Sequence, residues 1–230
     1  MIFDSLYMAI LFVGFALSAG ASMWTRATFN RYSEVATGGG RTGAEIAAAI
    51  LRAEGIRGVR IERVGGFLSD HYDPRARALR LSPDVHDGRS VSAAGVAAHE
   101  VGHALQHAQG YAPMKLRQVM VPVANIGTNL GLWIMVIGLG VGVSGLANVG
   151  VVLFGGFVVF TLVTLPVEFD ASFRARRSLE QHGLLGPTEL AGVSRVLTAA
   201  ASTYLAAAVA AVLQLLYWLM RLGLLGGRSR

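Results

Sequence analysis

Residues 97–106 read AAHEVGHALQ, and this stretch decides how the rest of the chain is interpreted. It contains the pattern His-Glu-x-x-His inside an alanine-rich run that favours a helix. Residues four apart lie one turn apart on the same helix face, so His99 and His103 can direct two imidazoles at one metal ion. Glu100 is then placed to act on a water bound to that metal. The stretch therefore predicts half of a catalytic zinc site.

The composition indicates a membrane protein. Of the 230 residues, 53% are hydrophobic and only 15% are charged, and the mean hydropathy is +0.51, whereas soluble domains carry about 25% charged residues. The net charge is +6, but the arginines are dispersed and no nucleic-acid-binding motif is present, so we expect no nucleic-acid partner. The chain has no cysteine, so its zinc ligands must be nitrogen or oxygen atoms.

Four apolar runs are long enough to cross a bilayer, which needs about 20 residues. They lie at 6–23, 120–143, 146–165 and 198–220. The first run could instead be a signal peptide, since the small residues at 19–21 resemble a cleavage site, but no basic residue precedes the run. We therefore predict an α-helical integral membrane protein with about four transmembrane helices and a small catalytic core.

The expected organisation has five parts. They are transmembrane helix 1 at 1–24, a zincin-like catalytic region at 25–118, a transmembrane hairpin at 119–166, a helical segment at 167–197, and transmembrane helix 4 with a tail at 198–230. Seventeen of the 20 basic residues fall in the second and fourth parts, so the positive-inside rule predicts an active site on the cytoplasmic side of a bacterial inner or plasma membrane. Three tail arginines favour the opposite orientation for the fourth run.

The patterns within 25–118 predict a small α+β core. A capping box at Thr42 and Glu45 predicts a helix, and alternation of apolar and polar residues predicts strands. In order, we expect a helix at 43–54, strands at 59–64, 66–72 and 76–81, a loop at 82–90 and the metal helix at 91–109. This order is typical of a zincin-like core, in which an edge strand near the metal can pair with an extended peptide.

A catalytic zinc ion takes three protein ligands and keeps one position open for water. His107 shares a helix face with the other two histidines, but it lies about 12 Å along the helix axis from His99, too far to share an ion. It is expected to be a second-shell or surface residue. The candidates for the third ligand are Asp70, His71, Asp73, His86, Glu168, Asp170, Glu180 and His182.

Glu168 is the preferred third ligand. It follows the third apolar run at once, on the side of the catalytic region, and an ionisable group at that depth is a functional candidate. The alternative is an interfacial carboxylate that balances an arginine or a helix N-terminus. Pro166 is expected to end the transmembrane helix, and a separate charged helix is expected at 169–182. Asp170 could hold the second nitrogen of a histidine, and His71 could contact substrate or simply belong to a strand and turn.

Four blocks of sequence carry a resemblance to a known family. They are LSDHYDP (68–74), LRLSPDVHDGRSV (79–91), GVAAHEVGHALQHA (95–108) and LPVEFDAS (165–172). In these blocks the chain resembles the membrane-bound neutral zinc metallopeptidases of the YugP-like type, and more distantly the HtpX-type and CAAX-processing membrane proteases. The resemblance implies Zn²⁺, peptide-bond hydrolysis and membrane residence. The distant families have an aspartate four residues after the later glutamate, and here that position is Ser172.

The sequence thus predicts a membrane-embedded zinc-dependent endopeptidase with Glu100 as general base. Its partners would be the lipid bilayer and a peptide or membrane-protein substrate, and no pattern indicates an oligomeric state. The alternative is a non-catalytic zinc-binding adaptor or regulatory protein, whose site would be closed by a fourth ligand and would have no use for Glu100. A transporter or channel is disfavoured because the apolar runs contain few charges.

Overall fold

A computed structural model describes residues 4–224 of the chain. The chain divides into two compact units. The apolar unit is built from Met1–Ala21, Lys115–Leu165 and Thr203–Arg230. The polar unit is built from Ser22–Met114 and Pro166–Ser202.

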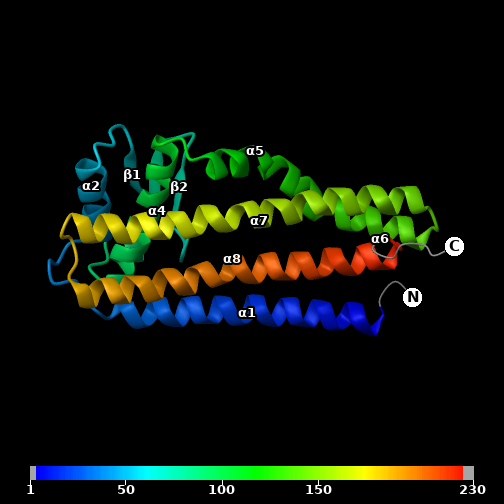
Figure 1. The fold of residues 1–230 in the computed structure, drawn as a ribbon. Helices are drawn as coiled ribbons and strands as arrows, with labels where there is room; N and C mark the ends of the chain where they lie inside the picture. Colours follow the sequence, from blue (N-terminus) through cyan, green and yellow to red (C-terminus); the bar gives the residue numbers. More distant parts are fainter. Residues whose placement is uncertain (1–3, 225–230) are drawn as a thin grey trace. The chain divides into compact units, whose positions relative to one another are not determined.

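Four helical stretches among residues 4–224 are long and apolar enough to cross a membrane, as predicted. They are α1 (Ser5–Ser33), the stretch Ala112–Gly140, α7 (Ser144–Gln181) and α8 (Pro187–Arg221). The second stretch is composite: α5 (Ala112–Ile126) leads through a π-helical turn, η1 (Gly127–Gly131), into α6 (Leu132–Gly140) (Figure 1). Each stretch has 29 to 38 residues, more than the roughly 20 that a bilayer requires.

Close helix packing in the apolar unit depends on glycine. A Cβ on Gly138 would lie 2.4 Å from the backbone nitrogen of Ala147, and one on Gly150 would lie 2.4 Å from that of Met135. Small residues let membrane helices approach to backbone contact, where van der Waals packing holds them together. The turn between α6 and α7 is tight, as expected, and Gly142 adopts φ +74° there.

The expectation that Pro166 ends a helix is wrong. Helix α7 continues through Pro166 without a break to Gln181 (Figure 1), so no separate helix begins near residue 169. A proline removes one backbone hydrogen bond, a loss that membrane helices tolerate when neighbouring groups satisfy the freed carbonyl. As a result, Glu168 is carried by the middle of a continuous helix and not by a helix start.

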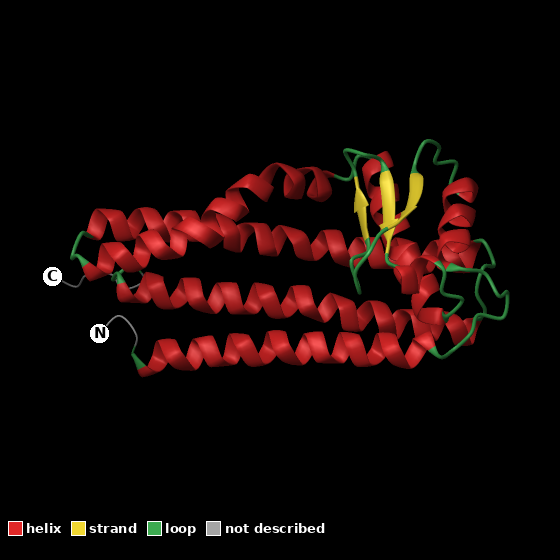
Figure 2. Ribbon diagram, turned by 180° about the vertical axis from the view of Figure 1, so that it is seen from behind, coloured by secondary structure: helices red, strands yellow, loops and turns green. Residues whose placement is uncertain are grey.

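The polar unit contains a three-stranded mixed sheet in the order β1-β3-β2. Strand β1 (Arg60–Arg63) runs parallel to β3 (Ala78–Leu81), and β2 (His71–Asp73) runs antiparallel to it. The strands lie side by side as one small sheet (Figure 2). The same unit contains the helices α2 (Gly43–Ala53) and α4 (Val91–Ala108). Helix α2 has the predicted capping box between Thr42 and Glu45.

Two details of this region differ from expectation. The strand predicted at 66–72 shortens to His71–Asp73 because Gly66 and Leu68 have positive φ angles of 107° and 52°, which an extended strand does not accommodate. The loop predicted at 82–90 contains a short helix, α3 (Pro83–His86), with Pro83 at its first turn.

Candidate metal centre

Helix α4 carries the histidine pair through the core of the polar unit. Ser90 caps its first turn by accepting a hydrogen bond from the backbone N–H of Ala93 at 3.2 Å. The residues around the pair are alanine, glycine and valine, and Ala97, Ala98 and Val101 are fully buried. Small side chains allow the neighbouring segments to approach the helix closely, which brings distant donor atoms within reach of the histidines.

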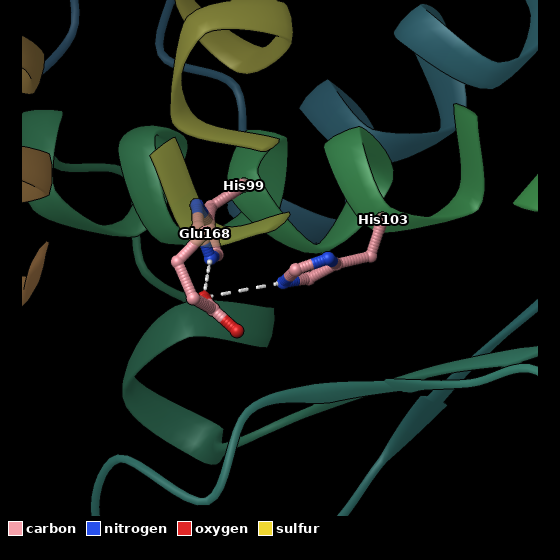
Figure 3. Close-up of side chains that lie close together, drawn as sticks. All are labelled: His99, His103 and Glu168. Carbon is pink, nitrogen blue, oxygen red and sulfur yellow. Dashed lines mark hydrogen bonds and ion pairs between the residues drawn. The ribbon is translucent and has the colours of Figure 1, made fainter. Parts of the chain in front are cut away.

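His99 and His103 meet the carboxylate of Glu168, which α7 brings to α4. Glu168 Oε2 lies 3.2 Å from His99 Nε2 and 3.5 Å from His103 Nε2. The two imidazole rings are nearly perpendicular, at 83°, and both point their nitrogens at the carboxylate (Figure 3). The Glu168 side chain is 3% exposed and those of the histidines are 14% and 10% exposed, so the cluster is largely shielded from solvent.

The three donors fit a zinc ion. One ligand atom from each residue lies within 4.8 Å of the other two. Two ligands about 2.1 Å from a tetrahedral ion are about 3.4 Å apart, which matches the separations of 3.2 and 3.5 Å between Glu168 and the histidines. Two neutral imidazoles and a carboxylate are also a donor set that zinc prefers, and they leave a fourth position for water.

Gly102 permits the approach of α7 to α4. A Cβ on this residue would lie 2.4 Å from the backbone oxygen of Ala171 and 3.1 Å from its Cα. Both contacts are with backbone, so no side-chain rotation could relieve them. The glycine between the two histidines therefore sets the distance between their helix and the one that carries Glu168.

Gln106 holds His103 in one orientation. Its buried amide nitrogen donates to the Val167 carbonyl and to Asp170 Oδ2, each at 2.8 Å. Because both acceptors require an N–H, the amide oxygen is the atom that lies 3.0 Å from His103 Nδ1. His103 must then carry its proton on Nδ1, which leaves the lone pair of Nε2 directed toward Glu168.

Asp170 and Ser172 also contact the residues of this cluster or their partners. Asp170 also accepts from the guanidinium of Arg174, which balances its charge. Asp170 therefore acts on the histidine through Gln106 and does not contact a histidine nitrogen itself. Ser172 Oγ lies 3.2 Å from His99 Nδ1, so the serine at the position of the distant families' aspartate contacts the first histidine.

The charge of Glu100 affects the pKa of two neighbouring groups. Burial by itself would lower the pKa of His103, but the hydrogen bond that the protonated ring donates to Glu168 and the charge of Glu100 raise it above its ordinary value. Burial raises the pKa of Asp70, the hydrogen bonds from Ser82 oppose this, and Glu100 raises it further. Glu100, 7% exposed, thus acts electrostatically on both His103 and Asp70, and a proton on Nε2 of His103 must leave before a metal can bind there.

Comparison with known proteins gives the family. Residues 7–223 match a family described as "Putative neutral zinc metallopeptidase". The chain belongs to this zinc metallopeptidase family. It is 43% identical over 216 residues to the "Putative membrane protease YugP" of Bacillus subtilis, covering 92% of this chain and 96% of that protein. No solved structure matches the chain.

Membership of a zinc peptidase family agrees with the metal cluster of His99, His103 and Glu168. It also supports a membrane location, together with the four candidate spans. Zinc is therefore the cofactor that this cluster of side chains is suited to bind.

The other candidate residues lie outside the cluster. His107 Nδ1 is 2.9 Å from the Tyr72 hydroxyl and so links α4 to β2. His71 is exposed on the edge strand, where its Nδ1 lies 2.8 Å from the Ser69 carbonyl. Asp70 binds the backbone and hydroxyl of Ser82.

The rest of the candidate set is engaged in ion pairs or hydrogen bonds with other partners, or lies on the surface, outside the metal cluster. These residues are Asp73, His86, Glu180 and His182.

Sequence reasoning missed Gln106. The available signal was its position, three residues after His103 on the same helix, which is the spacing at which helical side chains meet. Nothing local indicated that its amide would reach Val167 and Asp170, 61 and 64 residues away.

Proposed function

We propose that this protein is a membrane-embedded zinc-dependent endopeptidase that hydrolyses peptide bonds of membrane proteins. The observation that carries the proposal is the convergence of His99, His103 and Glu168 on one point, with Glu100 on the same helix as the histidines. Two histidines and a glutamate with an open position are a donor set of catalytic zinc sites. A structural site would be closed by a fourth ligand, and among residues 4–224 the cluster contains three.

Each residue has a distinct part in the proposed reaction. His99, His103 and Glu168 would hold the metal. When bound, the metal would act as a Lewis acid and lower the pKa of a coordinated water toward about 7. Glu100 accepts the proton of the attacking water and delivers it to the leaving amine. Gln106 keeps the Nδ1 proton of His103 in place throughout.

The proposed active site faces the cytoplasm. The basis is the distribution of basic residues, which favours the segments that carry the metal cluster. A carboxylate ligand on a helix that is long and apolar enough to span a membrane suits substrates that emerge from the bilayer, such as membrane proteins and their unfolded ends.

Glu100→Gln tests the proposal directly. The amide preserves the shape of the side chain but cannot accept the proton, so cleavage of an unfolded membrane protein is expected to fall by about 10²- to 10⁴-fold. Zinc content, measured by elemental analysis of the purified protein, should stay the same as in the unmodified chain. The control is Glu180→Gln, an exposed carboxylate on α7, which should leave both quantities unchanged.

Two outcomes would reject the proposal. Undiminished cleavage by the Glu100→Gln protein would remove Glu100 from the chemistry. A zinc-loaded unmodified protein that cleaves no membrane-protein substrate would favour a zinc-binding adaptor.

Gln106→Leu should weaken zinc binding without removing a ligand. Loss of the partner that orients a histidine ligand lowers metal affinity by about 10- to 100-fold, and competition with a fluorescent chelator would measure this. The matched control is Gln109→Leu, since Gln109 accepts from Arg174 but contacts no member of the metal cluster. Equal zinc affinities for the two variants would contradict the positioning role of Gln106.

A further inference from the structure

A second candidate site lies between α1 and α8 within the polar unit. A cavity of about 300 Å³ opens there, the lower end of the range for ligand pockets. Its walls combine two arginines with aromatic and hydroxyl side chains. We call it the Arg31–Arg195 pocket, and its lining includes Trp24, Thr28, Arg31, Tyr32, Arg195 and Thr198.

The two helices run antiparallel at this pocket. The Thr25 hydroxyl donates to the Ala199 carbonyl at 2.8 Å. Further along the pair, a Cβ on Gly192 would lie 2.9 Å from the ring of Tyr32. Because these contacts hold the helices together, the pocket is a built feature of the helix pair.

Both guanidinium groups lie close to Tyr32. Arg195 Nη1 donates to the Tyr32 hydroxyl at 3.2 Å, and the Arg31 guanidinium carbon lies 6.0 Å from the centre of the Tyr32 ring. Within residues 4–224 neither arginine forms an ion pair with a carboxylate, whereas Arg80, for example, pairs with Asp73 at 2.7 Å. Glu189, six residues before Arg195 on α8, accepts from the backbone N–H groups of Gly38 and Gly186. The pocket thus carries two positive charges that the protein does not neutralise.

The pocket lies where the apolar runs of α1 and α8 end. The apolar run of α1 stops just before Trp24, and that of α8 starts at Thr198. Arg195 is about 4.5 Å along the helix axis beyond Thr198, and Arg31 is about 10 Å beyond Trp24. The headgroup layer adds about 5–8 Å to each side of the hydrocarbon core. Arg195 therefore starts within this layer, and Arg31 starts just beyond it, from where its long side chain can extend back to the headgroups. Tryptophan at the boundary and arginine beyond it are the arrangement of a membrane–water interface.

We propose that the Arg31–Arg195 pocket binds the headgroup of an anionic phospholipid. The phosphate oxygens accept hydrogen bonds from the two guanidinium groups, and the half-exposed Trp24 ring packs against the glycerol and the start of an acyl chain. Basic pockets between membrane helices recognise anionic lipids by this combination of charge and contact. Lipid bound here would anchor α1 to α8 at the edge of the unit that carries the metal cluster.

The test compares lipid retention by purified full-length proteins. Detergent-solubilised protein is mixed with phosphatidylglycerol or phosphatidylcholine, and native mass spectrometry counts the bound lipids. The double variant Arg31→Gln, Arg195→Gln should bind phosphatidylglycerol about 30-fold more weakly, the equivalent of about 2 kcal/mol for two juxtamembrane arginines. The matched control is Arg26→Gln, an exposed cation on α1 that does not line the pocket, and it should bind as the unmodified chain does.

Three results would overturn the proposal. The double variant could retain phosphatidylglycerol unchanged, or Arg26→Gln could lose it equally, which would mean that binding follows net charge. Millimolar inorganic phosphate could displace the lipid completely, which would indicate a free-anion site. Melting temperatures and zinc contents, measured on the same samples, should match across all variants and so separate loss of lipid from loss of fold.

Discussion

Glu168→Gln is expected to abolish zinc retention and to reduce peptidase activity to background. The amide keeps the size of the side chain but loses the negative charge, and Oε2 is the atom that both histidines face at 3.2 and 3.5 Å. Loss of a residue that only orients a ligand lowers metal affinity by about 10- to 100-fold. Removal of a ligand itself should lower the affinity further. In the unmodified protein, zinc at 100 times its dissociation constant should stabilise the fold by about 2.7 kcal/mol.

The measurement is the melting temperature with and without added zinc, together with the metal content. The unmodified chain should show a zinc-dependent increase, and Glu168→Gln should show none. Glu180→Gln supplies the control, because its carboxylate lies on the same helix but on the surface. Stoichiometric zinc in Glu168→Gln would show that another residue is the third ligand.

Gly102→Ala is expected to separate α4 from α7 and so to disrupt the metal centre without touching a ligand. The added methyl group would lie 2.4 Å from the Ala171 carbonyl oxygen, a distance that packed atoms do not occupy. Overpacking of this kind destabilises a protein by about 1–3 kcal/mol, and more where the backbone must move. Since Glu168 is only one turn from Ala171 on α7, the same displacement should lower zinc content and activity together.

The control is a glycine of α7, the helix that faces Gly102. Among the described residues, no atom outside its immediate helical surroundings lies within 4 Å of a Cβ built on Gly155, so Gly155→Ala should leave the melting temperature and zinc content close to those of the unmodified chain. Thermal unfolding in detergent and metal analysis would measure both. A Gly102→Ala protein with normal melting temperature and full zinc would show that the two helices can move apart at no cost to the site.

The parts of the fold that depend on neighbouring residues were predicted well. The capping box at Thr42 and Glu45 predicted α2, because both hydrogen bonds close within three residues. The four apolar stretches were recognisable because bilayer thickness sets their length. The strand expected at 66–72 failed at Leu68, where the backbone adopts a left-handed conformation that no apolar–polar alternation reveals.

By itself the sequence determined the histidine pair. His99 and His103 are one helical turn apart, and that geometry follows from helix periodicity once residues 97–106 form a helix. Membrane character was equally readable, because hydropathy adds up along a single run of chain. The resemblance of four sequence blocks supplied the family.

The sequence favoured Glu168 as the third ligand, but only the tertiary structure shows which acid lies beside the histidine pair. Eight side chains had suitable chemistry, and the selection of Glu168 depends on α7 continuing through Pro166 and approaching α4 at Gly102. Two other features also join residues from different helices. They are the hydrogen bond from Gln106 to Asp170 and the pocket lined by both Arg31 and Arg195. Such contacts are set by the packing of whole helices against one another, and sequence spacing carries no record of the distance between segments that far apart in the chain.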